Sequence, residues 1–369
     1  MMKILFHTLY DNTFSSRFRI YQYLPYWERL GHRCEVAPAT TGARLRSCER
    51  FPRFVRRWGL HLSEVARRYQ AIRRSPGYDL VIIQKGFTTI DWRGWLALQQ
   101  KRRVPFIFDI DDAVHLAPGL VPPWPLRPFW DRNQIAKIAA AAKAVVAGNR
   151  YLAEEMRQYS NCVVEIPTSI DLQRHPYPAE KRQHRAEEAK RRVVLGWSGS
   201  SSSHPFLNSL LPVIRRLHDK HSHLELQLVS NTKKGIQLDA LGDTPVRLTL
   251  WSPETEVAAL EEMDIGLMPL GDSPLVKYKC AFKALQYMAL GAVAVVSPVG
   301  INREIVQDGR TGFLAGSEEE WFAVLDRLIR RPEDWSGVQS EARCLVEERF
   351  SVEKHALRWS RLFEEAAAQ

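Results

Sequence analysis

The 369-residue sequence predicts an α/β protein built from two Rossmann-like domains. In both halves, short apolar runs alternate with amphipathic segments, a pattern typical of buried parallel strands connected by helices. Residues 171–192 separate the halves and are polar, dense in charge and interrupted by proline, as linkers are. We therefore expect an N-terminal domain over residues 1–175 and a C-terminal domain over residues 190–349, with a ligand site between them.

The first half of the sequence contains six predicted strands. Each is a short, mostly apolar run bounded by glycine, proline or a polar cluster. The predicted strands cover residues 3–9, 34–39, 79–84, 104–110, 144–149 and 162–168. The predicted helices cover residues 19–31, 91–101, 131–143 and 151–159, with basic helical segments between residues 44 and 74.

The second half has the same alternation. Phe282, Leu285 and Ala289 recur at helical spacing until Gly291 ends the helix, and a valine-rich run then leads to the breaker cluster 297–300. Open α/β sheets bind ligands at the carboxyl ends of their strands, so this turn is a candidate ligand site. The predicted strands cover residues 193–199, 224–230, 246–251, 264–270, 293–296 and 312–315. The predicted helices cover residues 205–219, 254–262 and 282–290, followed by three helical segments from about residue 318.

Residues 44–74 carry ten arginines and two glutamates, in a chain with a net charge of +10 and an isoelectric point near 9.4. Their apolar residues recur every three or four positions and predict an apolar stripe opposite a basic face. Either the stripe packs on the protein's own sheet, or the helix lies on an anionic membrane surface. We expect no nucleic-acid partner, because the aromatic residues fall on the stripe and not among the basic side chains. The stripe comprises Phe51, Phe54, Val55, Trp58, Leu62, Val65, Tyr69 and Ile72.

Composition and absent motifs argue against several classes of protein. No apolar run approaches the ~18 residues of a membrane-spanning helix, and the first residues predict a strand rather than a signal peptide. The five cysteines are scattered without a C-x-x-C pair, which favours a reduced, cytoplasmic protein without structural zinc. The chain has neither G-x-G nor G-x-x-x-x-G-K, which argues against a dehydrogenase and a P-loop hydrolase.

Two segments of the second half could bind an anion. GWSGSSSSHPF (196–206) leads from a strand into a helix, where small residues and free N–H groups let a phosphate approach the backbone. Ser-rich turns are also common without a ligand. DSPLVKYKCAFK (272–283) places three lysines at a helix start, where the dipole disfavours cations unless an anion lies nearby.

The sequence FDIDDAVH (108–115) places three aspartates and a histidine at a strand end. Asp109, Asp111 and Asp112 could bind a metal, or single carboxylates could cap the turn and bond backbone N–H groups. A general base or a substrate-hydroxyl site that includes His115 is equally open. HDKHSH (218–223) has the composition of a metal cluster, but its place at a polar helix end favours a solvated segment.

The order of motifs resembles the retaining GT-B glycosyltransferases of family 4, also called glycosyl transferases group 1. The series runs from GWSGS through LTLWS, DIGLMPL and the stretch 279–291 to SPVGINREIVQDGRTGFL. In the first half, SSRFR (15–19), FDIDDAV and the segment 148–172 are similar to the same family. The resemblance implies two Rossmann-like domains facing each other across a cleft, with residues 350–369 returning to the N-terminal domain.

The resemblance also implies a nucleotide-diphosphate sugar, with UDP or GDP, as the donor. Lys279 and Lys283 would act in catalysis by neutralising the diphosphate, with Arg17 as a further phosphate or acceptor contact. Asp112 and His115 would orient the acceptor hydroxyl. The expected donor-binding residues are Gly199, Ser200, Ser201, Trp251, Gln286, Gly300, Ile301, Asn302 and Glu304, with Val299 in the same loop.

Two positions depart from the family's pattern. Members usually carry two glutamates where this sequence has Tyr278 and Gln286. A glutamine can still bond a ribose hydroxyl, but without the charge of a carboxylate. Two alternatives therefore stay open: a sugar-nucleotide epimerase of the same architecture, and a nucleotide-sugar-binding scaffold without catalysis.

The resemblance implies a retaining transfer that requires no metal cofactor, because lysines, arginines and helix dipoles stabilise the leaving diphosphate. We expect the acceptor to be a hydroxyl of a glycan or of a lipid-linked saccharide in cell-surface polysaccharide synthesis. The Pro- and Trp-rich segment 118–130 is either a simple loop or an acceptor- or membrane-facing lip. Together with residues 44–74, it favours a cytoplasmic protein that is peripheral on the inner face of the membrane.

Overall fold

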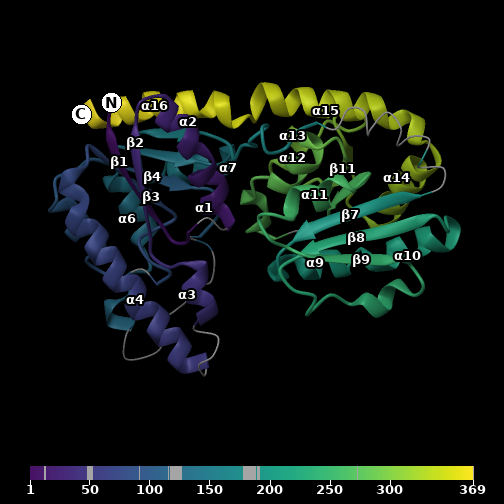
Figure 1. The fold of residues 1–369 in the computed structure, drawn as a ribbon, viewed down its shortest axis with the longest axis horizontal. Coiled ribbons are helices and arrows are strands. Elements are labelled where there is room, and N and C mark those ends of the chain that lie inside the picture. The colour runs from purple at the N-terminus through teal and green to yellow at the C-terminus, as the bar shows by residue number, and fades with distance from the viewer. Residues whose placement is uncertain are drawn as a thin grey trace. The chain divides into compact units, whose positions relative to one another are not determined.

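The structure is a computed structural model, and it describes residues 1–11, 14–47, 53–90, 92–114, 116, 127–177, 188, 192–271 and 273–368. The chain divides into two compact units, which are drawn in Figure 1. The first unit comprises Met1–Ser169, Tyr278–Cys280 and Val352–Gln369, and the second comprises Ile170–Lys277 and Ala281–Ser351. The expected boundary at residue 175 falls within the second unit, and the C-terminal helix belongs to the first.

The first unit contains a six-stranded parallel sheet in the order β2-β1-β3-β4-β5-β6. Its inner strands β3, β4 and β5 are buried on both faces, which explains their continuous apolar sequences. The strands are β1 (Lys3–Thr8), β2 (Arg33–Pro38), β3 (Leu80–Gln84), β4 (Phe106–Ile110), β5 (Ala144–Ala147) and β6 (Val163–Glu165). All six predicted strands of the first half are therefore confirmed.

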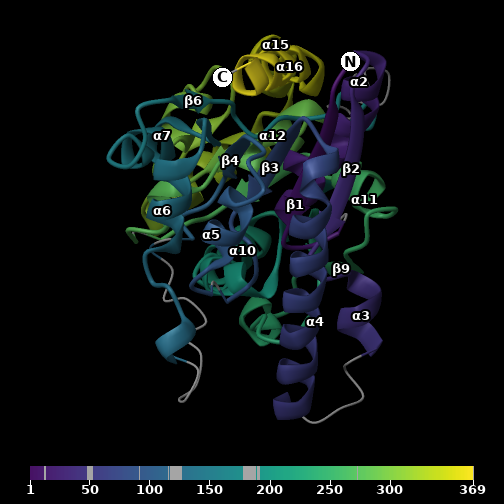
Figure 2. The same ribbon diagram turned by 90° about the vertical axis from the view of Figure 1, so that its left-hand side faces the viewer.

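Helices cover both faces of this sheet (Figures 1 and 2). They are α1 (Phe14–Arg19), α2 (Leu24–Arg29), α3 (Gly42–Ser47), α4 (Arg53–Arg74), α5 (Trp95–Gln100), α6 (Gln134–Ala141), α7 (Arg150–Met156) and α16 (Val352–Ala368), with 3-10 turns η1 (Tyr21–Tyr23), η3 (Ser75–Gly77) and η4 (Arg127–Phe129). Alternate strand residues separate two cores, with Ile4 and Phe6 on one face and Leu5 on the other. Helices α2 and α16 pack on the first face, and α4, α5 and α6 pack on the second.

The last helix completes the core on one face of the first sheet. Trp359 and Phe363 of α16 lie against Trp27 of α2, with ring centroids 6.0 and 5.2 Å away. Phe363 also lies edge-on to Phe6 of β1 at 6.3 Å. Each aromatic pair adds about 0.5–1.5 kcal/mol beyond the burial of its surface. The core of the first unit thus depends on the end of the chain.

The second unit contains a parallel sheet in the order β12-β11-β10-β7-β8-β9. Its strands are β7 (Val193–Gly199), β8 (Leu224–Ser230), β9 (Val246–Leu250), β10 (Ile265–Met268), β11 (Val293–Val296) and β12 (Phe313–Leu314). Its helices are α9 (His204–Asn208), α10 (Leu211–Lys220), α11 (Glu256–Glu261), α12 (Phe282–Ala289), α13 (Asn302–Ile305), α14 (Glu318–Arg330) and α15 (Trp335–Arg349), with 3-10 turns η5 (Ser201–Ser203), η6 (Leu238–Leu241) and η8 (Pro332–Asp334). A further turn, η7 (Val276–Tyr278), ends where the chain enters the first unit. The predicted α/β class is confirmed in both units.

Two predicted helices are each divided in the structure. Residues 19–31 form η1 and α2, and residues 205–219 form α9 and α10. Pro25, Pro205 and Pro212 each lie in the first turn of the helix that contains them. Proline lacks an N–H group and has a preset φ, so it begins a helix better than it continues one.

Helix α4 confirms the predicted basic helix, but it buries only part of the predicted apolar stripe. Of the described stripe residues, Leu62 is 66% exposed and Tyr69 is 46% exposed, whereas Ile72 is buried and Val65 packs half-buried against the core. The side chains of residues 51–58 lie outside the described part of the chain. The buried face instead passes through His61 and Arg68. The C-terminal half of α4 therefore packs on the sheet of its own unit. This is the first of the two interpretations that the sequence allows for residues 44–74.

Arg68 explains why the buried face is offset from the stripe. Its guanidinium donates to the carbonyl oxygens of Thr8 and Phe87 at 2.6 Å and to that of Ala37 at 3.2 Å. These carbonyls belong to β1, to β2 and to the segment after β3. A buried cation with satisfied donors thus replaces an apolar contact, which periodicity alone could not predict. In the described residues, no helix is long and apolar enough to cross a membrane.

Candidate active site

The carboxyl end of β7 turns into η5 through Gly199, Ser200 and Ser201. A Cβ atom on Gly199 would lie 2.4 Å from the Trp197 ring and 2.6 Å from Lys283 Nζ. A side chain at this position would therefore displace the lysine amine or the buried ring. Four of the predicted site residues, Gly199, Ser200, Ser201 and Lys283, thus meet at this end of the sheet.

Lys283 is the second residue of α12, and its amine reaches the end of β7. Its Nζ lies 5.0 Å from the ring centroid of Trp197, within the range of a cation–π interaction. His204 lies on the same tryptophan, with ring centroids 5.8 Å apart, and its Nε2 is 2.8 Å from Ser230 Oγ. Burial lowers the pKa of His204, and the charge of Lys283 lowers it further. The turn therefore carries a positioned cation beside a neutral imidazole.

The predicted loop after β11 is held in a tight turn. Gly300 has a φ of +50°, and a Cβ atom there would lie 2.4 Å from the carbonyl oxygen of Lys277. The Asn302 amide donates to the carbonyl oxygen of Ser297 at 2.9 Å, and Ser297 Oγ accepts from the N–H of Leu270 at 2.9 Å. Glycine is needed at position 300 both for the positive φ and for the close backbone approach.

Four further predicted donor-binding residues lie in the second unit. Ile301 precedes Asn302 at the start of α13, Glu304 is the third residue of that helix, and both are half-buried. The indole N–H of Trp251 donates to a glutamate of α11 at 2.9 Å. Gln286 is only 2% exposed, and its amide nitrogen lies 3.4 Å from His175 Nε2. Gln286 is thus part of the packing around α12, and its partner His175 was not singled out in the sequence.

Tyr278 and Lys279 lie in the short segment Tyr278–Cys280, which belongs to the first unit. The carbonyl oxygen of Tyr278 accepts from the Asn149 amide at 2.7 Å, and its hydroxyl donates to Glu155 at 3.3 Å. Lys279 is half-buried. Where the family resemblance predicts a glutamate, this chain therefore has an aromatic residue that is hydrogen-bonded to Glu155 of α7 and to Asn149, which precedes that helix.

Asp109 lies in β4 and Asp111 and Asp112 follow it, and all three have partners in the first unit. Asp109 is fully buried, and both of its carboxylate oxygens lie 3.2 Å from Arg19 Nε. Asp111 lies 3.2 Å from Lys85 Nζ. Asp112 Oδ1 accepts from the following backbone N–H at 2.9 Å, so Asp112 caps the turn. Among the residues that the structure describes, no group of three or more His, Cys, Asp and Glu side chains could hold a metal ion.

Lys85 and Arg19, which contact these aspartates, were not singled out in the sequence. Lys85 follows β3 with a φ of +63°, which is uncommon outside glycine and typical of strained positions in functional sites. Burial alone would lower the pKa of Lys85, but the carboxylates of Asp111 and Asp112 raise it above its ordinary value. The sequence signal that could have identified Lys85 is its position before a glycine at the carboxyl end of a predicted strand.

Arg17 is buried on α1, and its guanidinium carbon lies 4.8 Å from the Phe18 ring centroid. The neighbouring Ser16 donates to the Gln84 side chain at 2.8 Å, which fixes α1 against the end of β3. The predicted catalytic residue His115 and residues 118–126 lie outside the described part of the chain.

Comparisons with known proteins agree with this architecture. A family model described as Glycosyltransferase Family 4 matches residues 18–174, and one described as Glycosyl transferases group 1 matches residues 192–331. No match was found among curated proteins.

Solved structures that share the fold over nearly the full chain include the following three. HepE of Anabaena, in complex with UDP-glucose, has a TM-score of 0.69 and 15% identity over 99% of this chain and 100% of that chain. Sucrose-phosphate synthase of Thermosynechococcus elongatus has a TM-score of 0.69 and 14% identity over 100% of both chains. A glycosyltransferase of Rickettsia africae has a TM-score of 0.67 and 13% identity over 99% of this chain and 98% of that chain.

Matches to two glycosyltransferase models, one for each half, accompany the ordered motifs and the pair of six-stranded parallel sheets. The chain belongs to the glycosyltransferases of group 1 and family 4, with the GT-B architecture.

Proposed function

We propose that this glycosyltransferase transfers a sugar from a nucleotide-diphosphate sugar to a hydroxyl group, with retention of anomeric configuration. The observation that carries the proposal is the amine of Lys283 at the Gly199 turn, where an added Cβ atom would lie 2.6 Å from that amine. A diphosphate fits such a turn, because the turn combines a fixed cation with N–H groups at a helix start. The complexes of HepE with UDP and UDP-glucose favour a uridine nucleotide over GDP here.

In this proposal, Lys283 neutralises the diphosphate and Gly199, Ser200 and Ser201 let it approach the backbone. Lys279 adds a second positive charge. The donor's nucleotide and sugar contact the remaining donor-binding residues, among which Asn302 acts mainly by holding the Gly300 loop. These residues are Trp251, Gln286, Gly300, Ile301, Asn302 and Glu304.

The transfer breaks the bond between the anomeric carbon and the diphosphate oxygen while the acceptor oxygen attacks the same face. The acceptor's proton passes to the leaving phosphate. Lysine charge and helix N-termini stabilise the negative charge on the diphosphate, so the proposed reaction requires no metal.

The acceptor is oriented by Asp112 and His115, with Arg17 as a further anion or hydroxyl contact. Lys85, which lies 3.8 Å from Asp112, fixes that carboxylate. We take the acceptor to be a glycan or lipid-linked saccharide at the inner membrane surface. Membership of a transferase family favours this reaction over epimerisation.

The identity of the donor is tested by measuring the thermal stability of the protein with UDP-, GDP- and ADP-sugars. Each measurement is made in EDTA and then in magnesium. A ligand at 100 times its Kd stabilises the folded protein by about 2.7 kcal/mol, which raises the melting temperature measurably. We expect a rise with UDP-sugars that EDTA does not remove. Lys283→Met should weaken donor binding roughly 10- to 100-fold, because it removes a charge-assisted contact of about 1.5–3 kcal/mol.

Lys220→Met is the matched control, because Lys220 lies at the far end of α10 and pairs with Asp326 at 2.8 Å. Its donor affinity should equal that of the unaltered protein. Equal binding by the Lys283 variant would remove Lys283 from the donor site. Binding without transfer to any hydroxyl acceptor would instead support the non-catalytic alternative.

A further inference from the structure

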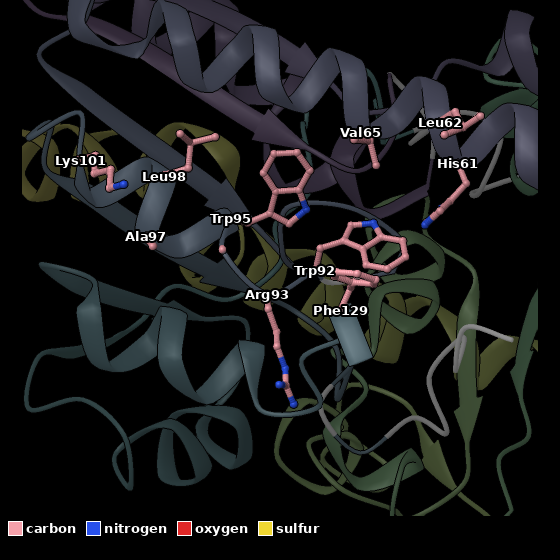
Figure 3. A pocket seen from close by; sticks show the side chains of 11 residues that line it. His61, Leu62, Val65, Trp92, Arg93, Trp95, Ala97, Leu98, Lys101 and Phe129 are labelled. Carbon is pink, nitrogen blue, oxygen red and sulfur yellow. The ribbon is translucent and has the colours of Figure 1, made fainter. Parts of the chain in front are cut away.

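A cavity of about 670 Å³ lies in the first unit between α4 and α5, apart from the residues assigned to the donor (Figure 3). Helix α4 contributes His61, Leu62 and Val65, while α5 and the residues before it contribute Trp92 and Trp95. Arg93, Gly94, Ala97, Leu98, Lys101 and Phe129 complete the lining. Volumes of roughly 300–1,000 Å³ are typical of small-molecule sites.

The cavity is lined mainly by apolar side chains, whose positions are fixed by backbone hydrogen bonds. Phe129 is 61% exposed and Leu62 66% exposed, although both are large apolar side chains. The backbone N–H of Arg93 donates to the carbonyl oxygen of Phe129 at 2.7 Å, and Trp92 forms an antiparallel bridge with Trp130. These bonds fix the aromatic side chains around a common space (Figure 3). A preformed cleft of this kind is suited to a hydrocarbon chain.

The polar groups of the cavity favour an anionic or oxygen-rich head on that chain. The charged side chains in its described lining are Arg93 and Lys101, both cationic and exposed, with no carboxylate among them. Within the described chain, the buried Trp92 Nε1 and His61 Nε2 have no hydrogen-bond partner. An indole N–H can only donate, so it requires an acceptor oxygen. The two rings lie 5.4 Å apart, close enough for one head group to meet both.

The His61 end of the cavity lies at the carboxyl edge of the first sheet. Glu64, one turn further along α4, accepts hydrogen bonds from both the N–H and the hydroxyl of Thr89, in the segment after β3. Lys101 lies at the other end of the cavity in Figure 3, where α5 leads back to the start of β4. The same carboxyl edge carries Lys85 and Asp112. A head group near His61 would therefore lie at the same edge of the sheet as the residues assigned to the acceptor.

We propose that this cavity binds the single hydrocarbon chain of an anionic amphiphile, with its charged head at the His61 end. The identification of this amphiphile as the lipid carrier of the acceptor rests on the proposed function. The binding itself does not, since it involves neither donor nor transfer.

The proposal is tested by calorimetric titration of the full chain with octyl, decyl and dodecyl phosphate, each below its micelle concentration. Burial of each added methylene should tighten binding roughly threefold to fourfold. Leu62→Glu should weaken dodecyl phosphate binding at least tenfold, because it places a negative charge in the cleft. Arg93→Gln should weaken binding of dodecyl phosphate but not of dodecanol, which lacks the charge.

Leu357→Glu is the matched control, because Leu357 is 48% exposed on α16 of the same unit and does not line the cavity. It should leave the affinity unchanged, and circular dichroism should find both leucine variants folded. Ala97→Trp fills the cleft without adding charge and should also abolish binding.

Affinity that does not depend on chain length, or an equal loss in the Leu357 variant, would overturn the proposal. So would binding to vesicles of anionic phospholipid without any binding of monomeric alkyl phosphate, which would indicate a membrane-adhesive surface. Nucleotide-induced stabilisation reports the donor site separately, so failure of the cavity proposal and failure of the proposed function are distinguishable.

Discussion

At the residue scale, the pair of Arg19 and Asp109 links three parts of the first unit. The guanidinium lies in α1, the carboxylate at the end of β4, and Arg19 Nη1 donates to the carbonyl oxygen of Ile166 at 2.7 Å. Both side chains are fully buried. Burial alone would lower the pKa of Arg19, but the Asp109 carboxylate raises it above its ordinary value, so the guanidinium stays charged.

Arg19→Met should destabilise the first unit by about 3–5 kcal/mol, because it leaves a buried carboxylate without its counter-charge. The free energy of unfolding from urea titration measures this loss. Arg74→Met is the control in the same unit, since Arg74 pairs with Glu35 at 2.9 Å where both side chains are about half exposed. That surface pair should contribute about 0–1 kcal/mol. Equal losses in the two variants would contradict the importance assigned to the buried pair.

The residues of the candidate site were only partly predictable, for a physical reason. The segments around Gly199 and Gly300 and the position of Lys283 followed from breakers and cations at strand ends, and these are local signals. Lys85 and Arg19 were missed because their significance lies in partners more than twenty positions away. A sequence without an alignment does not reveal such pairs.

At the element scale, helix α12 packs so closely on β10 that no side chain fits at position 266 of the strand. A Cβ atom on Gly266 would lie 2.3 Å from the Tyr287 ring. That ring is held at its far end, where its hydroxyl accepts from the N–H of Ser198 at 2.9 Å. The ring therefore cannot move away without loss of a buried hydrogen bond.

Gly266→Ala should destabilise the second unit by about 1–3 kcal/mol through overpacking. Chemical denaturation monitored by circular dichroism measures the change. Gly337→Ala serves as the control, because Gly337 lies in α15 with no atom within 4 Å of an added Cβ. That change should stabilise the helix by about 0.5–1 kcal/mol, so the two alanine variants are expected to differ in sign. A stabilised Gly266 variant would show that the ring can shift.

Element types were predictable because short buried strands and amphipathic helices leave strong periodic signals. The face that each helix buries was less predictable. In α4, the sequence favours a face with Leu62 and Tyr69, whereas the folded helix buries Arg68 against three backbone carbonyls. The three carbonyl oxygens that Arg68 meets are brought together only once the strands are assembled. The apolar side chains left over at Leu62 and Val65 then line the cavity beside α5.

At the scale of the whole molecule, each unit has cores of its own. The clusters around the first sheet draw on α16, whereas those around the second sheet draw on α12, α14 and α15. The predicted return of the C-terminal helix to the N-terminal domain rested on the family resemblance, since no periodicity in the sequence specifies which sheet a terminal helix covers.

Trp359→Ala should therefore destabilise one unit selectively. Trp359 is fully buried between Trp27 and Phe363, and removal of such a ring costs about 3–5 kcal/mol. Hydrogen exchange followed by mass spectrometry should detect faster exchange in peptides from β1 to β6, with peptides from β7 to β12 unchanged. Leu357→Ala, an exposed position on the same helix, should leave both sets unchanged. Equal loss of protection in both sheets would mean that the units unfold as one cooperative body, despite their separate cores.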